Sequence, residues 1–265
     1  MLVHVVADYG HGDLAFAEVI QRIKYHLPDA ETVPTPVPPF ATLAAGFCIA
    51  QLALNQAPPG TLVYHNVAPR EDELRARQAN SGERLAFARL RTGVRVIGVN
   101  AGHAFSFLRD LAEELRWAAA PAEGSQFRSR DLFPQAAAAI ATGLPDALAE
   151  LLSYDDIPDV PPQSIAYIDG YGNMKTTIQA GHLEEKTGAR VRMDVDGRGG
   201  EATIAGASFA VEPGEMALAP GSSGWPDGGG GEIRWMELFL RGGSAWEALG
   251  RPPIGARVDL HLSGG

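Results

Sequence analysis

The hydrophobic pattern of this chain changes its period at one place, the proline- and aspartate-rich stretch DDIPDVPPQ (residues 155–163). Before it, strand-like runs such as LVHVVA alternate with helix-like runs such as LAFAEVIQRIKYHL, an order typical of parallel strands joined by helices. After it, short runs of period two are separated by glycine-rich turns, which indicates an all-β unit. We therefore predict an α/β domain over residues 1–157, a mainly parallel sheet flanked by helices, and a small β-barrel domain over residues 163–265.

Local signals predict several elements within these domains. Asp13 is a good N-cap for a helix that begins at the next residue, and Asp131 is expected to cap the helical block DLFPQAAAAIATG. The runs ERLAFARL and VRVIGVN flank the turn RTG and predict an antiparallel hairpin, whereas FSFLRDL, after Asn100, is expected to be helix core. Strands of the second domain are predicted at SIAYID, NMKTTI, ARVRMDVD, EATIAG, ASFAVE, EIRWMELFL and ARVDLHL.

Composition and motifs exclude several classes of function. The formal net charge of −10 would repel a phosphate backbone, so we expect no nucleic-acid partner. No basic leader precedes Asp8 and no stretch approaches the roughly 20 apolar residues of a membrane span, so we expect a cytoplasmic protein with no membrane partner. The sequence has no zinc-type spacing, no GxGxxG after a strand, no phosphate loop and no GxSxG elbow. We therefore expect neither a metal nor a bound cofactor.

Three polar clusters follow predicted strands, where open α/β sheets place their ligands. The first is DYGHGD, in which Asp8 either caps a turn or accepts hydrogen bonds from a ribose diol, whereas Asp13 is interpreted as a cap. The second, from His65 to Asn80, is typical of a solvated charged loop. The third is IDGYGNMKTTI, where an aromatic ring beside an amide suits a purine, although an ordinary hairpin has the same pattern. His65 and His103 are expected to be satisfied structural groups.

Taken together, these pieces resemble the family of adenosine-forming S-adenosylmethionine hydrolases, also called SAM hydroxide adenosyltransferases, and their relatives the fluorinases and chlorinases. The resemblance rests on DYGHGD, PDAETVPTPVPPF, AAGF, YHNVAPR, FRSRDLFPQAAAAIATG, YIDGYGNMKTTI and ELFLRGGSAWEALG, in that order along most of the chain. It implies an α/β domain joined to a small β-barrel domain, a homotrimer, and a ligand held between one subunit's N-terminal domain and its neighbour's C-terminal domain. It also implies that the ligand is S-adenosylmethionine or adenosine.

The resemblance also implies roles for individual residues. Asp8 would bind the ribose diol and Asp169 would face the methionine ammonium group. The ammonium group and the carboxylate of Asp169 would attract each other because their charges are opposite. The remaining substrate contacts would come from the wall residue Phe127, the stacking residue Tyr171, and the polar residues Asn173 and Arg241.

The catalytic positions depart from the family pattern. Where the hydrolases have an aspartate and a histidine, this chain has Asn66 and Arg128, and the family's arginine corresponds to Arg75 or Arg77. Asn66 cannot accept a proton from water and Arg128 stays charged, so neither replaces a general base. The leading hypothesis remains displacement at the ribose 5′ carbon, giving adenosine and methionine, with Arg77 and Arg128 shaping the nucleophile site and Ser129 donating to it. The alternatives are a non-catalytic binder or sensor of S-adenosylmethionine or adenosine, and displacement by a halide.

Overall fold

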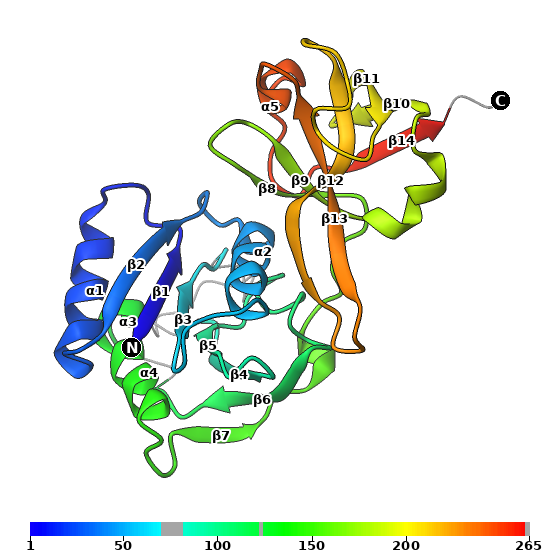
Figure 1. The fold of residues 1–265 in the computed structure, drawn as a ribbon. Coiled ribbons are helices and arrows are strands. Elements are labelled where there is room, and N and C mark those ends of the chain that lie inside the picture. The colour runs from blue at the N-terminus through cyan, green and yellow to red at the C-terminus, as the bar shows by residue number, and fades with distance from the viewer. Residues whose placement is uncertain (70–81, 122–123, 263–265) are drawn as a thin grey trace. The chain divides into compact units, whose positions relative to one another are not determined.

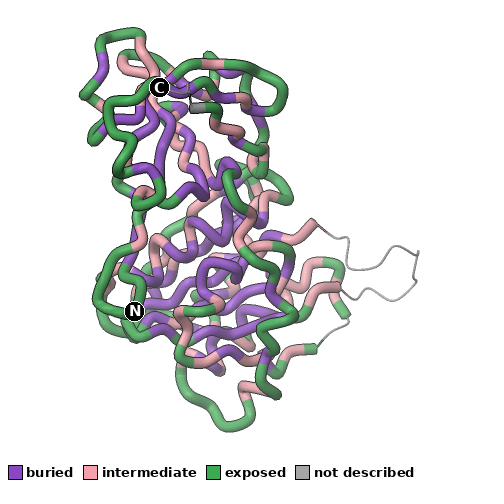
Figure 2. Tube along the Cα trace, turned by 90° about the vertical axis from the view of Figure 1, so that its right-hand side faces the viewer, coloured by how far each residue is buried: buried purple, intermediate pink, exposed green. Residues whose placement is uncertain are grey.

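The chain forms two compact units, residues 1–159 and 160–265. The computed structural model describes residues 1–69, 82–121 and 124–262 (Figure 1). Each unit is built on its own seven-stranded sheet, and buried residues gather along the strands of each sheet (Figure 2). The units are described separately below.

The first sheet is mixed, with the strand order β2-β1-β3-β5-β4-β6-β7. The half formed by β2, β1, β3 and β5 is parallel, whereas β4, β6 and β7 are antiparallel to their neighbours. The expectation of a mainly parallel sheet therefore holds for only half of it. The reason is the hairpin at RTG, which was predicted correctly and reverses the chain between β4 and β5. The strands are β1 (Leu2–Ala7), β2 (Glu31–Pro36), β3 (Leu62–Asn66), β4 (Leu85–Leu90), β5 (Arg95–Val99), β6 (Ala112–Ala118) and β7 (Leu148–Leu151).

Helices cover both faces of the parallel half. Asp13 caps α1 (Leu14–His26) as predicted, because its side chain accepts a hydrogen bond from the backbone N–H of Ala15 at 2.7 Å. The buried face of α1 packs with α4 (Phe133–Ala141) on alternate residues of β1, including Val3 and Val5. The apolar helix α2 (Thr42–Ala53) contacts β1, β3 and β5 and shares no residue with that cluster, so it lies on the other face.

Two predictions in this unit are wrong. Asp131 does not cap α4; it is the last residue of the short helix α3 (Arg128–Asp131), and its carboxylate instead accepts hydrogen bonds from Ser125 and Arg130. The segment FSFLRDL forms turns rather than a helix, although Phe105 and Leu108 are fully buried as a core segment requires. Burial pattern alone did not distinguish consecutive turns from a helix. The unit ends with the short helix η1 (Tyr154–Asp156).

The second sheet curls into a half-barrel with the order β14-β10-β11-β12-β13-β9-β8. A bridge between Ser164 and Arg257 brings its two ends together, and the N–H of Val258 donates to the carbonyl of Gln163 at 2.6 Å. All pairs are antiparallel except β11 with β12, so this sheet is also mixed. Its elements are β8 (Ile165–Ile168), β9 (Met174–Gln179), η2 (Ala180–His182), η3 (Glu184–Lys186), β10 (Arg190–Val195), β11 (Arg198–Ile204), β12 (Met216–Pro226), β13 (Glu232–Leu240), α5 (Ala245–Ala248) and β14 (Val258–Leu262).

One strand of the second unit lies where none was predicted. The run ASFAVE forms turns, and the strand in this part of the chain is instead β12. Its residues Pro220 and Gly221 interrupt the alternating pattern that is typical of a strand. The register of β12 against β13 shifts between Pro220 and Gly224. Proline and glycine within a strand mark such irregular positions, which a simple period-two pattern misses.

Candidate functional site

The first candidate region lies at one edge of the first sheet, where β1, β2 and β3 end together. Ala7 pairs with both Pro36 and Asn66 in parallel register, so Asp8 and Asn66 share the carboxyl edge of the sheet. Ligands of open α/β sheets bind at this edge. The structure thus places the predicted ribose-binding carboxylate and the altered catalytic position at adjacent strand ends.

Asp8 holds the loop that follows β2. Its Oδ2 accepts a hydrogen bond from the backbone N–H of Phe40 at 2.9 Å. Phe40 has a φ of 62°, an uncommon conformation for a bulky residue, and the residue is 56% exposed. Strained residues are concentrated at functional sites, so the exposed residue Phe40, whose backbone N–H is bound to Asp8, is a candidate ligand contact. Sequence reasoning missed Phe40, for which the only signal was an aromatic residue directly after two prolines.

Phe127 and Ser129 are joined to Tyr9 in a packed aromatic cluster. The Tyr9 ring meets the Phe127 ring edge to face, with the centroids 5.9 Å apart, and the Tyr9 hydroxyl donates to Ser129 Oγ at 2.7 Å. The Tyr64 hydroxyl donates to the Ser129 carbonyl at 2.6 Å, and complete burial raises the pKa of Tyr64 well above its usual value. Ser129 is therefore buried and fixed by two tyrosines, neither of which was singled out from the sequence.

Arg130 also contacts the Phe127 ring. Its guanidinium lies 4.9 Å from the centroid of that ring and forms ion pairs with Asp131 at 2.7 Å and Glu18 at 3.1 Å. The hydrogen bond from Arg130, aided by that from Ser125, lowers the pKa of Asp131 to about 2. These charges are therefore engaged in positioning the segment that carries Phe127.

Of the arginines predicted at the nucleophile site, the structure describes only Arg128. Arg128 lies with its guanidinium 5.3 Å from the Phe133 ring centroid and donates to the carbonyl of Gly82 at 3.4 Å. Arg77 lies outside the described residues, as does Arg75. The role of Arg77 and Arg128 in shaping the nucleophile site stays a prediction.

His65 was expected to be a satisfied structural group, and the structure corrects this. It is fully buried, and within the described part of the chain neither Nδ1 nor Nε2 has a hydrogen-bond partner. Its ring packs against Gly98, where a Cβ would overlap it, and lies 5.3 Å from the Phe105 ring. Burial lowers the pKa of His65 from 6.5 to about 3. His103 was also expected to be a satisfied structural group, and its Nδ1 does have a hydrogen-bond partner, Ser106 Oγ at 3.2 Å.

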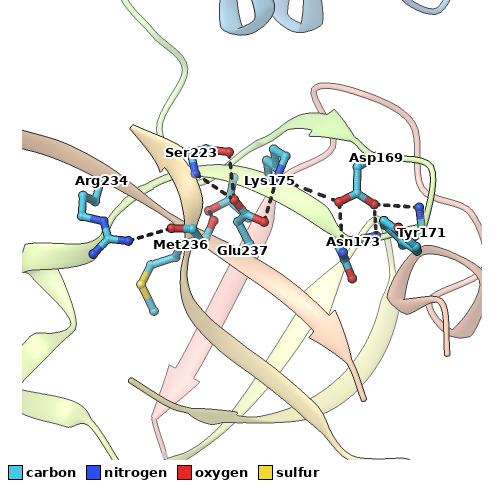
Figure 3. A network of polar contacts seen from close by, with 10 residues as sticks. Asp169, Tyr171, Asn173, Lys175, Ser223, Arg234, Met236 and Glu237 are labelled. Carbon is cyan, nitrogen blue, oxygen red and sulfur yellow. Dashed lines mark hydrogen bonds and ion pairs between the residues drawn. The ribbon is translucent and has the colours of Figure 1, made fainter. Parts of the chain in front are cut away.

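The second candidate region is the turn between β8 and β9, shown in Figure 3. Asp169 organises it: Oδ1 accepts from the backbone N–H groups of Tyr171 at 2.9 Å and Asn173 at 3.0 Å, and Oδ2 accepts from the Asn173 side chain at 3.0 Å. Tyr171 is 82% exposed at the tip. The structure thus brings together three of the predicted ligand residues and leaves one aromatic face open to a partner.

The same turn is anchored to α5. The backbone N–H of Trp246 donates to the carbonyl of Gly172 at 2.9 Å. Gly172 has a φ of 78°, and a Cβ at this position would overlap the Ser244 hydroxyl, so only glycine fits. The guanidinium of Arg241 donates to the carbonyl of Val211 at 2.6 Å, and its contact to the ligand stays a prediction.

Behind the turn lies a buried ion pair that sequence reasoning missed. Lys175 Nζ lies 2.8 Å from Glu237 Oε2 and 4.0 Å from Asp169 Oδ2 (Figure 3). Glu237 is 1% exposed and also accepts a hydrogen bond from the Ser223 hydroxyl at 2.8 Å. The available signal was a single acid in the otherwise apolar part of the run EIRWMELFL, since buried charges are normally paired.

A pocket of about 430 Å³ occurs elsewhere in the second unit, next to η2 and η3. It is lined by Leu183, Arg234 and Met236 among others, and by none of the residues of the 169–173 turn. Hollow space alone does not define a site. Among the described residues, no three His, Cys, Asp or Glu side chains are grouped so that they could hold a metal ion, and none of the helices has the length and hydropathy of a membrane span.

Comparison with known proteins defines the class of the second unit. Residues 163–227 match the family model of the SAM hydroxide adenosyltransferase C-terminal domain. This match contains the Asp169 turn and β9, and it confirms the predicted resemblance to the SAM hydroxide adenosyltransferase family. No curated protein matches the chain.

Solved structures resemble the whole chain in fold. A crystal structure of an uncharacterized conserved protein from Thermotoga maritima is 21% identical, with a TM-score of 0.76 over 97% of this chain and 99% of that one. A conserved hypothetical protein from Thermus thermophilus is 24% identical, with a TM-score of 0.68 over 98% of this chain and 99% of that one. At such identities the likeness extends to the fold alone, which these three proteins share along almost their entire length.

Proposed function

We propose that the protein binds S-adenosylmethionine and cleaves it at the ribose 5′ carbon, giving adenosine and methionine. The observation that supports this proposal is a pair of preformed polar groups in a chain whose second unit matches the SAM hydroxide adenosyltransferase C-terminal domain. One is the Asp8 carboxylate at the carboxyl edge of the first sheet, with Phe40 beside it. The other is the rigid 169–173 turn, which presents Tyr171.

Each contact suits one part of the ligand. A carboxylate accepts hydrogen bonds from two neighbouring hydroxyls, so Asp8 would hold the ribose diol. Tyr171 would stack on the adenine, and Asn173 would contact its polar edge. We further propose a homotrimer in which these contacts come from neighbouring subunits, with Phe127 as a wall and Arg241 turning from Val211 towards the ligand.

The proposed chemistry is an in-line displacement. The oxygen of water or hydroxide forms a bond to the 5′ carbon while the bond from that carbon to sulfur breaks and its electron pair stays on sulfur. Methionine leaves as a neutral thioether, and the proton of water passes to solvent. Because a sulfonium is already activated as a leaving group, positioning and desolvation supply much of the rate. Ser129 and the arginines Arg77 and Arg128 would orient the nucleophile.

A second function, binding without turnover, is favoured by one observation at the same edge of the sheet. Asn66 stands at the end of β3, where the related hydrolases have a carboxylate, and an amide does not accept a proton from water. A tight complex with S-adenosylmethionine or adenosine would then be the functional state.

One experiment separates these functions. Purified protein is incubated with S-adenosylmethionine, with and without chloride, and the nucleosides are resolved by chromatography. Adenosine formed in proportion to enzyme supports hydrolysis, and a 5′-chlorinated nucleoside supports halide displacement. Saturable binding in calorimetry with no product supports the binder. If S-adenosylmethionine and adenosine both fail to bind, the proposal is wrong.

A further inference from the structure

The charge of the 169–173 turn depends on the residues behind it (Figure 3). Lys175 Nζ lies 4.0 Å from Asp169 Oδ2, close enough for an ammonium group to offset the carboxylate. The Asp169 side chain is 22% exposed, whereas that of Lys175 is 12% exposed. Without a further partner, Lys175 would leave the turn without net charge.

Glu237 supplies that partner. Its carboxylate lies nearer to Lys175, at 2.8 Å, and is almost completely buried, where charges are screened least. Glu237 Oε1 accepts from the Ser223 hydroxyl at 2.8 Å and the Ser223 backbone N–H at 3.3 Å, and a Cβ at Gly221 would overlap the carboxylate. Glu237 is therefore held in one position with its second oxygen directed at Lys175.

We propose that Glu237 is a specificity-determining residue that keeps the ligand-binding turn negatively charged by taking up the charge of Lys175. The three groups Asp169, Lys175 and Glu237 carry one net negative charge. The partly exposed member is Asp169, so this charge is presented to the ligand. The turn then selects cationic adenosyl compounds over neutral ones with the same base and sugar. This inference rests on the proposed function, and it concerns discrimination between ligands of that site.

The substitution Glu237→Gln tests this directly. A glutamine that keeps its oxygen toward Ser223 turns its amide nitrogen toward Lys175, so the ammonium group keeps Asp169 as its carboxylate partner. The double variant Lys175→Met/Glu237→Gln removes both of these charges. The turn then keeps the single negative charge of Asp169, the same net charge as in the wild-type protein. Glu232→Gln is the matched control, because Glu232 lies on the same strand and is exposed.

Affinities for S-adenosylmethionine and adenosine are measured by calorimetry on the full-length protein and the three variants. We expect the preference for S-adenosylmethionine to fall about tenfold in Glu237→Gln, the size of one partly screened charge interaction. We expect it to return in the double variant and to stay unchanged in Glu232→Gln. Circular dichroism confirms folding, and the double variant keeps the test valid if the single variant unfolds.

An unchanged preference in Glu237→Gln, or a loss that persists in the double variant, overturns the inference while leaving the proposed function intact. Failure of the wild-type protein to bind either compound overturns the proposed function and the inference with it. The two failures are distinguished by the wild-type titrations.

Discussion

His65 makes the stability of the first unit depend on pH. Its imidazole is fully buried, and among the described residues its two ring nitrogens have no hydrogen-bond partner. Burial lowers its pKa from 6.5 to about 3 in the folded protein. Between these values the unfolded chain binds a proton that the folded chain does not, so stability falls as the pH falls below 6.5.

The loss of stability follows from how far burial lowers the pKa of His65. Below about pH 6 the loss approaches about 1.4 kcal/mol per pH unit, and between pH 7 and pH 5 it reaches about 2 kcal/mol. His65→Met is unbranched and close in volume, and it removes both the titration and the unpaired nitrogens. It is expected to be about 1–3 kcal/mol more stable than wild type at neutral pH, since a buried polar group without a partner costs about that much.

The assay is urea unfolding at several values of pH from 7.5 to 5, followed by fluorescence, with the exposed residue His11 changed to Asn as control. The difference in free energy of unfolding between His65→Met and wild type should widen as the pH falls, and the His11 variant should follow wild type. Parallel curves for His65→Met and wild type, or an imidazole that titrates near pH 6.5 by NMR, would refute the argument.

Three further changes test the site. Tyr9→Phe removes the hydroxyl that donates to Ser129 and should cost about 1 kcal/mol of stability by urea unfolding, whereas an unchanged midpoint would mean that this bond contributes nothing. Asn66→Asp supplies a proton acceptor at the end of β3 and should raise adenosine formation about 100-fold if water activation limits the rate, which single-turnover chromatography measures. Gly172→Ala forces a positive φ and a clash with Ser244, so it should lower stability by about 1–3 kcal/mol; a melting temperature equal to that of wild type contradicts this.

Local sequence signals predicted those elements whose formation depends on neighbours in the chain. The Asp13 cap, α1 and the hairpin of β4 and β5 follow from the residues within them. β12 does not, because Pro220 interrupts its pattern and the strand is held by pairing with β13. Asp131 has the residue type and position of a helix N-cap, but its carboxylate accepts a hydrogen bond from the Arg130 side chain instead of capping α4.

The residues of the candidate site likewise include some that local sequence signals predicted and some that they did not. Asp8 was predicted as a strand-end carboxylate, and Asp169, Tyr171 and Asn173 as a turn, since their relation is local. The contact from Phe40 to Asp8 spans 32 residues, and the one from Lys175 to Glu237 spans 62, so no spacing rule connects either pair. Such pairs are determined by the packing of distant strands, which a single sequence does not display.

The proposed function requires that the carboxylate at the end of β1 and the turn before β9 both hold one adenosyl ligand. Calorimetric titration of S-adenosylmethionine into the wild-type protein, Asp8→Ala and Asn173→Ala tests it most directly. We expect saturable binding to the wild-type protein, and each substitution should weaken it at least about tenfold, the loss expected for a charged or amide hydrogen bond to the ligand. Binding that both variants retain at wild-type affinity would contradict it.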